Sequence, residues 1–160
     1  MKNSDLFDML LLHESEEFMK EIDKIEDINC LNKTKANLLQ KALSEKLFTI
    51  ARELINRGIN INNQDINGMT ALHYLSDHFD LGIAKLLLEK GADVNIKDKH
   101  GNNALWYSIG NNKCNELSKL LGDAGADIYS KNVYGKSVFD KTLKYEGEEL
   151  VRVKELLGIE

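Results

Sequence analysis

The chain has 160 residues, of which 42% are hydrophobic and 29% charged, a length and balance that fit one globular domain. No apolar run approaches the roughly 20 residues that cross a bilayer, and the first residues lack the apolar segment of a secretory signal. We therefore expect a cytoplasmic protein with no membrane partner. The net charge of -5 argues against nucleic acid as the partner, because phosphate binding requires a clustered basic face.

The first 31 residues predict two helices. Ser4 can cap a helix through Leu6, Phe7, Leu10 and Leu11, and a second helix should start near Ser15, with Phe18, Ile22 and Ile25 on one stripe. Residues 1–28 carry nine acids and three lysines, so the chain's net negative charge is concentrated at this end.

Residues 32–64 predict another helix pair. Asn37-Leu-Leu-Gln40 begins the first helix, and the second should run over Phe48–Asn56. Residues 65–97 repeat this arrangement with a clearer turn signal, because Gly68 opens a turn before Thr70-Ala-Leu-His73. Leu81–Glu89 forms the expected second helix, which Gly91 ends.

A period of 33 residues connects these segments. Gly68 recurs as Gly101 and Leu72 as Leu105, each 33 residues later. The unit at 98–131 has one extra residue, which we place in the loop at 110–113. The unit at 132–160 should contain a helix over Ser137–Tyr145 and a final helix over about Glu148 to Leu157, ended by Gly158.

Two elements of the 65–97 unit resemble an ankyrin repeat. They are Gly-x-Thr-x-Leu-His at residues 68–73 and Leu-Leu-x-x-Gly-Ala-Asp-Val-Asn at residues 87–95. The resemblance implies a single all-α repeat solenoid, an ankyrin-like stack of helix-turn-helix units joined by β-hairpin-like finger turns. Its units would be 32–64, 65–97 and 98–131, between a degenerate N-terminal capping unit (1–31) and a C-terminal capping repeat (132–160).

Some positions depart from the family pattern. Lys35 occupies the place of the turn glycine, and Ala71, Ala104 and Val138 stand where the family usually has proline. The resemblance implies that Thr70 forms a hydrogen bond at the start of its helix and that His73 ties neighbouring turns together. Trp106 replaces that histidine in the next unit, which removes the polar tie and adds a large ring.

The sequence predicts no cofactor, no metal site and no catalytic residues. His73 and His78 are five residues apart, which puts them on different faces of a helix. A calcium loop from Asp65 would need glutamate at its twelfth place, where Ser76 stands. Cys30 and Cys114 lie in different units, so we expect two reduced thiols.

Proteins are the partners that the resemblance implies, bound by the finger turns and by a concave groove along the first helices. Ile66, Met69, Val133 and Tyr134 are apolar at projecting places, and the nearby Lys97, Lys99, His100, Lys131 and Lys136 suit an acidic partner surface. The candidate partner-binding residues are Ile66, Asn67, Met69, Lys97, Lys99, His100, Asn102, Lys131, Val133 and Tyr134 on the fingers, with Asp77, His78, Trp106 and Asn111 in the groove.

Alternatives remain open at this stage. Met69 and Tyr134 could instead fold onto their turns, and Trp106 could be half-buried between units. The repeats and caps would use the whole chain and leave no effector domain, so we expect a monomer that acts by stoichiometric occlusion, such as a bacterial immunity or antitoxin protein. A scaffold or regulatory adaptor is the second hypothesis, and a small enzyme with a site in the groove is the third.

Overall fold

The structure, a computed structural model, describes residues 2–109 and 115–158. Over these residues the chain forms ten α-helices, one short 3₁₀ helix and no strand, which confirms the all-α prediction. The helices are α1 (Asn3–Leu11), α2 (Ser15–Glu21), η1 (Ile22–Lys24), α3 (Leu38–Ser44), α4 (Phe48–Asn56), α5 (Ala71–Tyr74), α6 (Leu81–Glu89), α7 (Ala104–Ser108), α8 (Asn115–Asp123), α9 (Val138–Thr142) and α10 (Gly147–Leu157).

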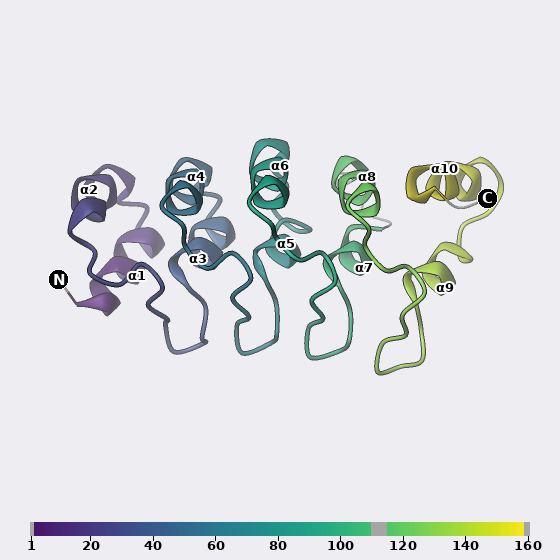
Figure 1. Cartoon of the computed structure of the whole chain (residues 1–160), viewed down its shortest axis with the longest axis horizontal. Coiled ribbons are helices and arrows are strands. Elements are labelled where there is room, and N and C mark those ends of the chain that lie inside the picture. Colours follow the sequence, from purple (N-terminus) through teal and green to yellow (C-terminus); the bar gives the residue numbers. More distant parts are fainter. Residues whose placement is uncertain (1, 110–114, 159–160) are drawn as a thin grey trace.

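The helices stack in two tiers along a single axis. Figure 1 shows α2, α4, α6, α8 and α10 in the outer tier, above an inner tier of α1, α3, α5, α7 and α9. Long loops project from the inner tier on the side away from the outer helices. Each unit packs against its neighbours, as α3 does against α1 and α5. The molecule is therefore a repeat solenoid.

The core consists of apolar side chains at equivalent positions in successive units. Leu39, Leu72 and Leu105 of the inner tier are at most 2% exposed. Leu54, Leu87 and Leu121 of the outer tier are fully buried. Burying one leucine contributes roughly 1.5–3 kcal/mol. Such packing is needed, because helices as short as α5 and α9 are not stable alone in water.

Polar side chains start the inner helices. Asn37 accepts a hydrogen bond from Gln40 N at 3.0 Å, and Asn103 accepts one from Trp106 N at 3.1 Å. Thr70 meets the ring of His73, with 2.9 Å between its Oγ1 and the His73 Nδ1, so the expected hydrogen bond at this helix start is present.

Three details of the predicted helices were wrong. Lys2 rather than Ser4 is the N-cap of α1, because the helix begins at Asn3, where the Asp5 carboxylate accepts a hydrogen bond from Lys2 N and places Ser4 inside the first turn. Ile25 lies beyond α2, which ends at Glu21 and continues only as η1. The helix expected to reach Tyr145 ends at Thr142. Within the described part of the chain, no helix is long and apolar enough to cross a membrane.

Candidate functional site

Four loops project from the described part of the stack, and we call them fingers: residues 31–36, 64–69, 97–102 and 131–136. Each is closed by the residue at its second position. Asp65 N donates to Met69 O at 3.1 Å, while the Asp65 Oδ1 accepts from Asn67 N and Met69 N at 2.7 and 3.0 Å. Asn32, Asp98 and Asn132 make the same pair of side-chain bonds in their fingers. This residue is therefore turned into the finger and away from its outer surface.

A left-handed residue shapes each finger. The φ angles are 59° at Lys35, 76° at Gly68, 78° at Gly101 and 68° at Gly135. Lys35 thus adopts the conformation of the missing glycine. At Gly68 a Cβ atom would lie 3.0 Å from the Asp98 Cα, so this position also requires a residue without a side chain.

Hydrogen bonds join the fingers side by side. Ile66 N donates to Thr34 O at 2.7 Å, Lys99 N to Asn67 O at 2.8 Å, and Val133 N to His100 O at 2.9 Å. A second series runs behind the fingers, where Asn29, Asn62 and Asn95 each accept a bond from the backbone of the next unit at 2.7–2.9 Å. Together these bonds hold the fingers in one row.

Polar side chains of the inner helices also tie the fingers together. The His73 Nε2 lies 3.1 Å from Asn102 O in the next finger, so the structure shows the tie expected for this histidine. Gln40 has the same role one unit earlier, donating to Met69 O at 2.7 Å. Burial lowers the pKa of His73, which favours the neutral ring.

Two tyrosines that the sequence analysis missed complete the finger network. Tyr74 donates its hydroxyl to the Asp65 Oδ2 at 2.9 Å, and Tyr107 donates to the Asp98 carboxylate. Burial and the adjacent Asp98 raise the pKa of Tyr107 to about 12, and burial likewise raises the pKa of Tyr74. The spacing of 33 residues between the two Asp/Tyr pairs was a usable signal in the sequence.

The exposed charge on the fingers is entirely positive. Their only carboxylates are Asp65 and Asp98, each 7% exposed and hydrogen-bonded through both oxygens. All the finger lysines are exposed, and they are Lys33, Lys35, Lys97, Lys99, Lys131 and Lys136. Lys33 and Lys35 were not among the predicted residues, although their finger follows the same period. We call the exposed side chains of the four fingers the finger edge.

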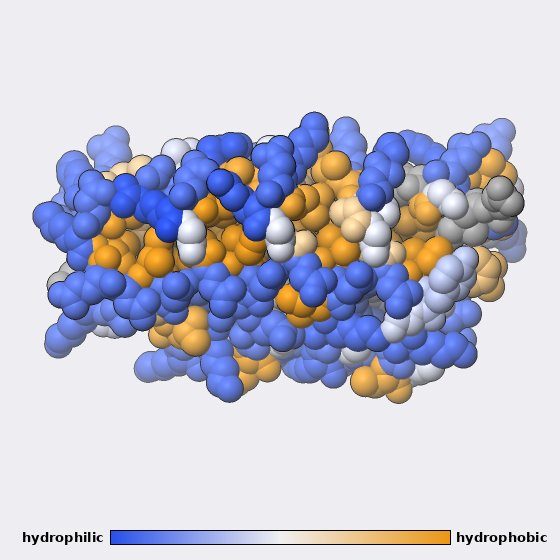
Figure 2. All heavy atoms as spheres, in the orientation of Figure 1, coloured by the Kyte–Doolittle hydropathy of each residue, from blue (hydrophilic) through white to orange (hydrophobic). Residues whose placement is uncertain are grey.

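Apolar side chains interrupt this basic row. Ile66, Val133 and Tyr134 are 61%, 66% and 70% exposed, so Tyr134 does not fold onto its turn. The His100 ring stacks on Tyr134, with 6.2 Å between ring centroids. Figure 2 shows hydrophobic side chains among hydrophilic ones along the lower edge, where the fingers project in Figure 1. The finger edge is therefore both basic and apolar.

The other finger residues that were predicted to bind a partner are less accessible on the surface. Asn67 and Met69 are half-buried, and the Asn67 Oδ1 accepts a hydrogen bond from the Lys99 Nζ at 2.6 Å. Lys97 is exposed but donates to the Ser130 hydroxyl. The structure thus restrains these side chains within the finger row.

Asn102 does not project as expected. It is 7% exposed, its Oδ1 accepts from the Asn132 Nδ2 at 2.9 Å, and its Nδ2 donates to the Tyr107 hydroxyl at 3.3 Å. The cause is the next finger, which covers this side chain. Asn102 therefore supports the finger row from inside and does not belong to the finger edge.

The groove candidates are scattered. Asp77 is exposed and His78 half-buried, and both follow α5. Trp106 is half-buried against the core, with the Lys141 Nζ 5.1 Å from its ring centroid. Asn111 lies outside the described residues.

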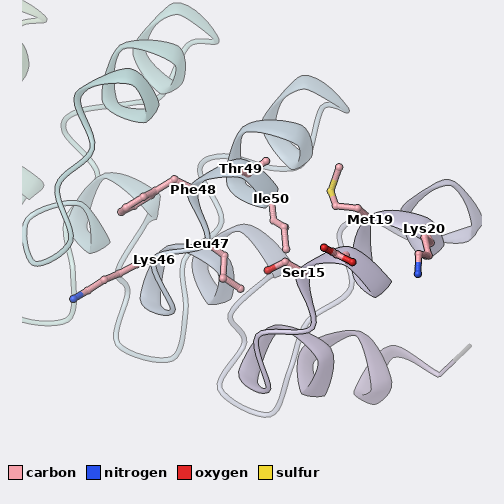
Figure 3. Close-up of a pocket in the computed structure, with 9 residues that line it drawn as sticks. Ser15, Met19, Lys20, Lys46, Leu47, Phe48, Thr49 and Ile50 are labelled. Carbon is pink, nitrogen blue, oxygen red and sulfur yellow. The ribbon is translucent and has the colours of Figure 1, made fainter.

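An open hollow of about 620 Å³ lies away from the fingers, between α2 and the start of α4. Leu47 and Ile50 face Ser15 and Met19 across it, and the Lys46 side chain points away (Figure 3). None of the described residues that line it is a histidine or cysteine. Elsewhere in the described chain, no three His, Cys, Asp or Glu side chains are grouped as metal ligands would be.

Comparison with known proteins gives two family matches. A family model described as "Ankyrin repeats (3 copies)" matches residues 2–98, and one described as "Ankyrin repeats (many copies)" matches residues 86–141. No curated protein matches the chain.

Proposed function

Because the chain belongs to the ankyrin repeat family, whose repeats are protein–protein interaction modules, we propose that it binds a partner protein through the finger edge. The partner surface would be acidic. One observation carries this proposal: six exposed lysines share an edge whose two carboxylates are buried and engaged within the fingers. The positive charge of this edge is opposite in sign to the overall charge of -5. It would raise the rate of association with an acidic partner more than the affinity.

The apolar tips would supply much of the affinity. Ile66, Val133 and Tyr134 bury less than half of their surface in the fold, and covering them with a partner would remove further apolar area from water. Tyrosine is also enriched among the residues that dominate binding energy in interfaces. The hydrogen bonds between fingers reduce the entropy lost on binding, because the row is already ordered.

Occlusion is the mode of action that we propose. A rigid row of fingers can cover the working surface of one partner molecule, and a bacterial immunity protein or antitoxin that neutralises a toxin is the concrete form. We further propose that the free protein is a cytoplasmic monomer. Light scattering after size exclusion should give one chain's mass, and a dimer would contradict this.

Affinity capture with mass spectrometry tests the proposal. The bait is the tagged chain, compared with a triple variant of the finger edge, Lys33→Glu, Lys99→Glu and Lys131→Glu. The control carries the same charge change on exposed residues in or directly after the outer helices, Lys85→Glu, Lys90→Glu and Lys119→Glu. We expect one acidic protein to be recovered by the wild type and the control but not by the finger variant.

The opposite pattern, with binding lost only in the control, would place the interface on the outer helices and refute the proposal. Occlusion is tested by assaying the activity of the recovered partner with and without this protein. The partner should be inactive in a one-to-one complex. An active partner bound together with a second protein would instead support a scaffold or adaptor.

A further inference from the structure

One position of the repeat carries a polar side chain that contacts a carboxylate in three units. In the fourth unit, the side chain at this position contacts no carboxylate among the described residues. The position is nine residues after the residue that closes each finger, and it is occupied by Lys41, Tyr74, Tyr107 and Lys141. The Lys41 Nζ lies 2.6 Å from the Glu45 Oε1. Tyr74 and Tyr107 donate to Asp65 and Asp98.

Lys141 has no carboxylate from the residue that closes its finger, and none from the residue four positions after it. Its finger is closed by Asn132 in place of aspartate, and Tyr145 stands where Glu45 stands in the first pair. Its Nζ instead donates to Trp106 O at 2.5 Å and lies 5.1 Å from the centroid of the Trp106 ring. Among the described residues, Lys141 forms no ion pair.

The Lys141 ammonium is partly removed from water, and its contacts among the described residues include no anion. Lys141, on α9, is half-buried against Trp106 of α7, and burial lowers its pKa, with repulsion from Lys144 acting in the same direction. An anion that reaches a partly desolvated cation interacts with it more strongly than in bulk water, because the lower dielectric screens the attraction less. The nearby exposed Lys144 would attract that anion without occupying the site.

We propose that Lys141, held against Trp106, is a receptor for a carboxylate of the partner protein, an aspartate or glutamate side chain that would pair with its ammonium as Glu45 pairs with Lys41. This inference rests on the proposed function, because it assigns an anchoring residue to the acidic partner. The Lys141 ammonium would meet the carboxylate as a compact point charge with rotatable donors.

The protein has a built-in reporter for this site. Trp106 is its only tryptophan, so intrinsic indole fluorescence reports on the atoms next to Lys141. The probe is an octaglutamate peptide, titrated at constant ionic strength against sodium chloride. Binding of a fluorescein-labelled copy is measured in parallel by anisotropy, which does not depend on Trp106.

Three variants define the expected result. Lys141→Met keeps an apolar stem and removes the charge, so it should abolish the fluorescence change and weaken binding about tenfold, as for loss of one charge-assisted hydrogen bond. Lys141→Arg should retain most of the binding. Lys41→Met, the matched change at the equivalent position already paired with Glu45, should leave the dissociation constant within about twofold of the wild type.

Thermal melting separates binding from folding. Lys141→Met should melt no lower than the wild type, because it removes a half-buried charge, and a lower melting point together with lost binding would show a structural role and overturn the inference. Unchanged octaglutamate binding by Lys141→Met, with binding lost in the finger variant, would also overturn it while the proposed function stands. If the wild type binds no octaglutamate, the acidic partner and the Lys141 receptor are both refuted.

Discussion

The finger row and the helical tiers occupy the same units but are held together by different forces. The fingers are organised by hydrogen bonds to buried polar groups such as Asp65, Asp98 and Asn132, which are at most 8% exposed. The tiers are organised by leucines that make no directional bonds. A polar network depends on the identity of each atom, whereas apolar packing depends mainly on volume. The helices should therefore control stability and the fingers should control recognition.

The largest effect is expected in the helical tier. Leu72→Ala removes a side chain that is 2% exposed and should lower the free energy of unfolding by about 2–5 kcal/mol. Leu81→Ala changes a residue that is 38% exposed and serves as the control. Urea unfolding followed by circular dichroism measures both. Equal losses would mean that burial does not distinguish these positions.

The next largest effect on stability is expected from substitutions of the finger glycines. Gly68 and Gly135 share a left-handed φ, but only at Gly68 would a Cβ meet the backbone of a neighbouring finger, at 3.0 Å. Gly135→Ala should cost about 1 kcal/mol of unfolding free energy for the conformation alone. Gly68→Ala should cost more, roughly 2–3 kcal/mol, because the finger contact must also open. Identical costs would show that the spacing between fingers is not restrictive.

The histidine tie predicts a dependence of stability on pH. Burial lowers the pKa of His73, so below the usual value of about 6.5 the unfolded chain takes up a proton that the folded chain excludes. The free energy of unfolding of the wild type should then fall between pH 6.5 and 5, by at most about 2 kcal/mol, the limit for one proton over roughly 1.5 pH units.

His73→Gln should remove this part of the pH dependence. Gln40 already makes the equivalent tie one unit earlier, so the substitution keeps the hydrogen bonds without a titrating group. Differences between wild type and variant at pH 7 and pH 5 isolate His73, since His13, His78 and His100 are present in both proteins. If the free energy of unfolding falls equally with pH in the wild type and in His73→Gln, His73 is not the group responsible.

The smallest effect on stability is expected at the finger edge. Reversing Lys99 and Lys131 to glutamate should change the free energy of unfolding by less than about 0.5 kcal/mol, as for other exposed sites. The same variant should slow association with the acidic partner about tenfold at low salt, measured by stopped flow. An unchanged association rate, together with slower association for Lys85→Glu and Lys119→Glu, would move the interface to the outer helices.

The sequence alone predicted the helix pairs and the family. It could do so because the fingers repeat similar residue types at spacings of 33, 33 and 34, with Asn or Asp at the second position, and those residues act locally. Asp65 bonds to backbone groups two and four residues away, and Gly68 takes a conformation that its own residue type permits. The projection of Ile66, Val133 and Tyr134 also follows from their place at the tip of each turn.

Only the tertiary structure decided which polar residues face inward. Asn102 has the same place in its finger as Lys136, yet one is buried and the other exposed, because a further finger covers Asn102. The pairing of Lys141 with Trp106 likewise depends on how α9 packs against α7, and nothing local to either residue specifies it. Contacts within a unit are determined by the sequence of that unit, whereas burial between units is determined by what the next unit places against it.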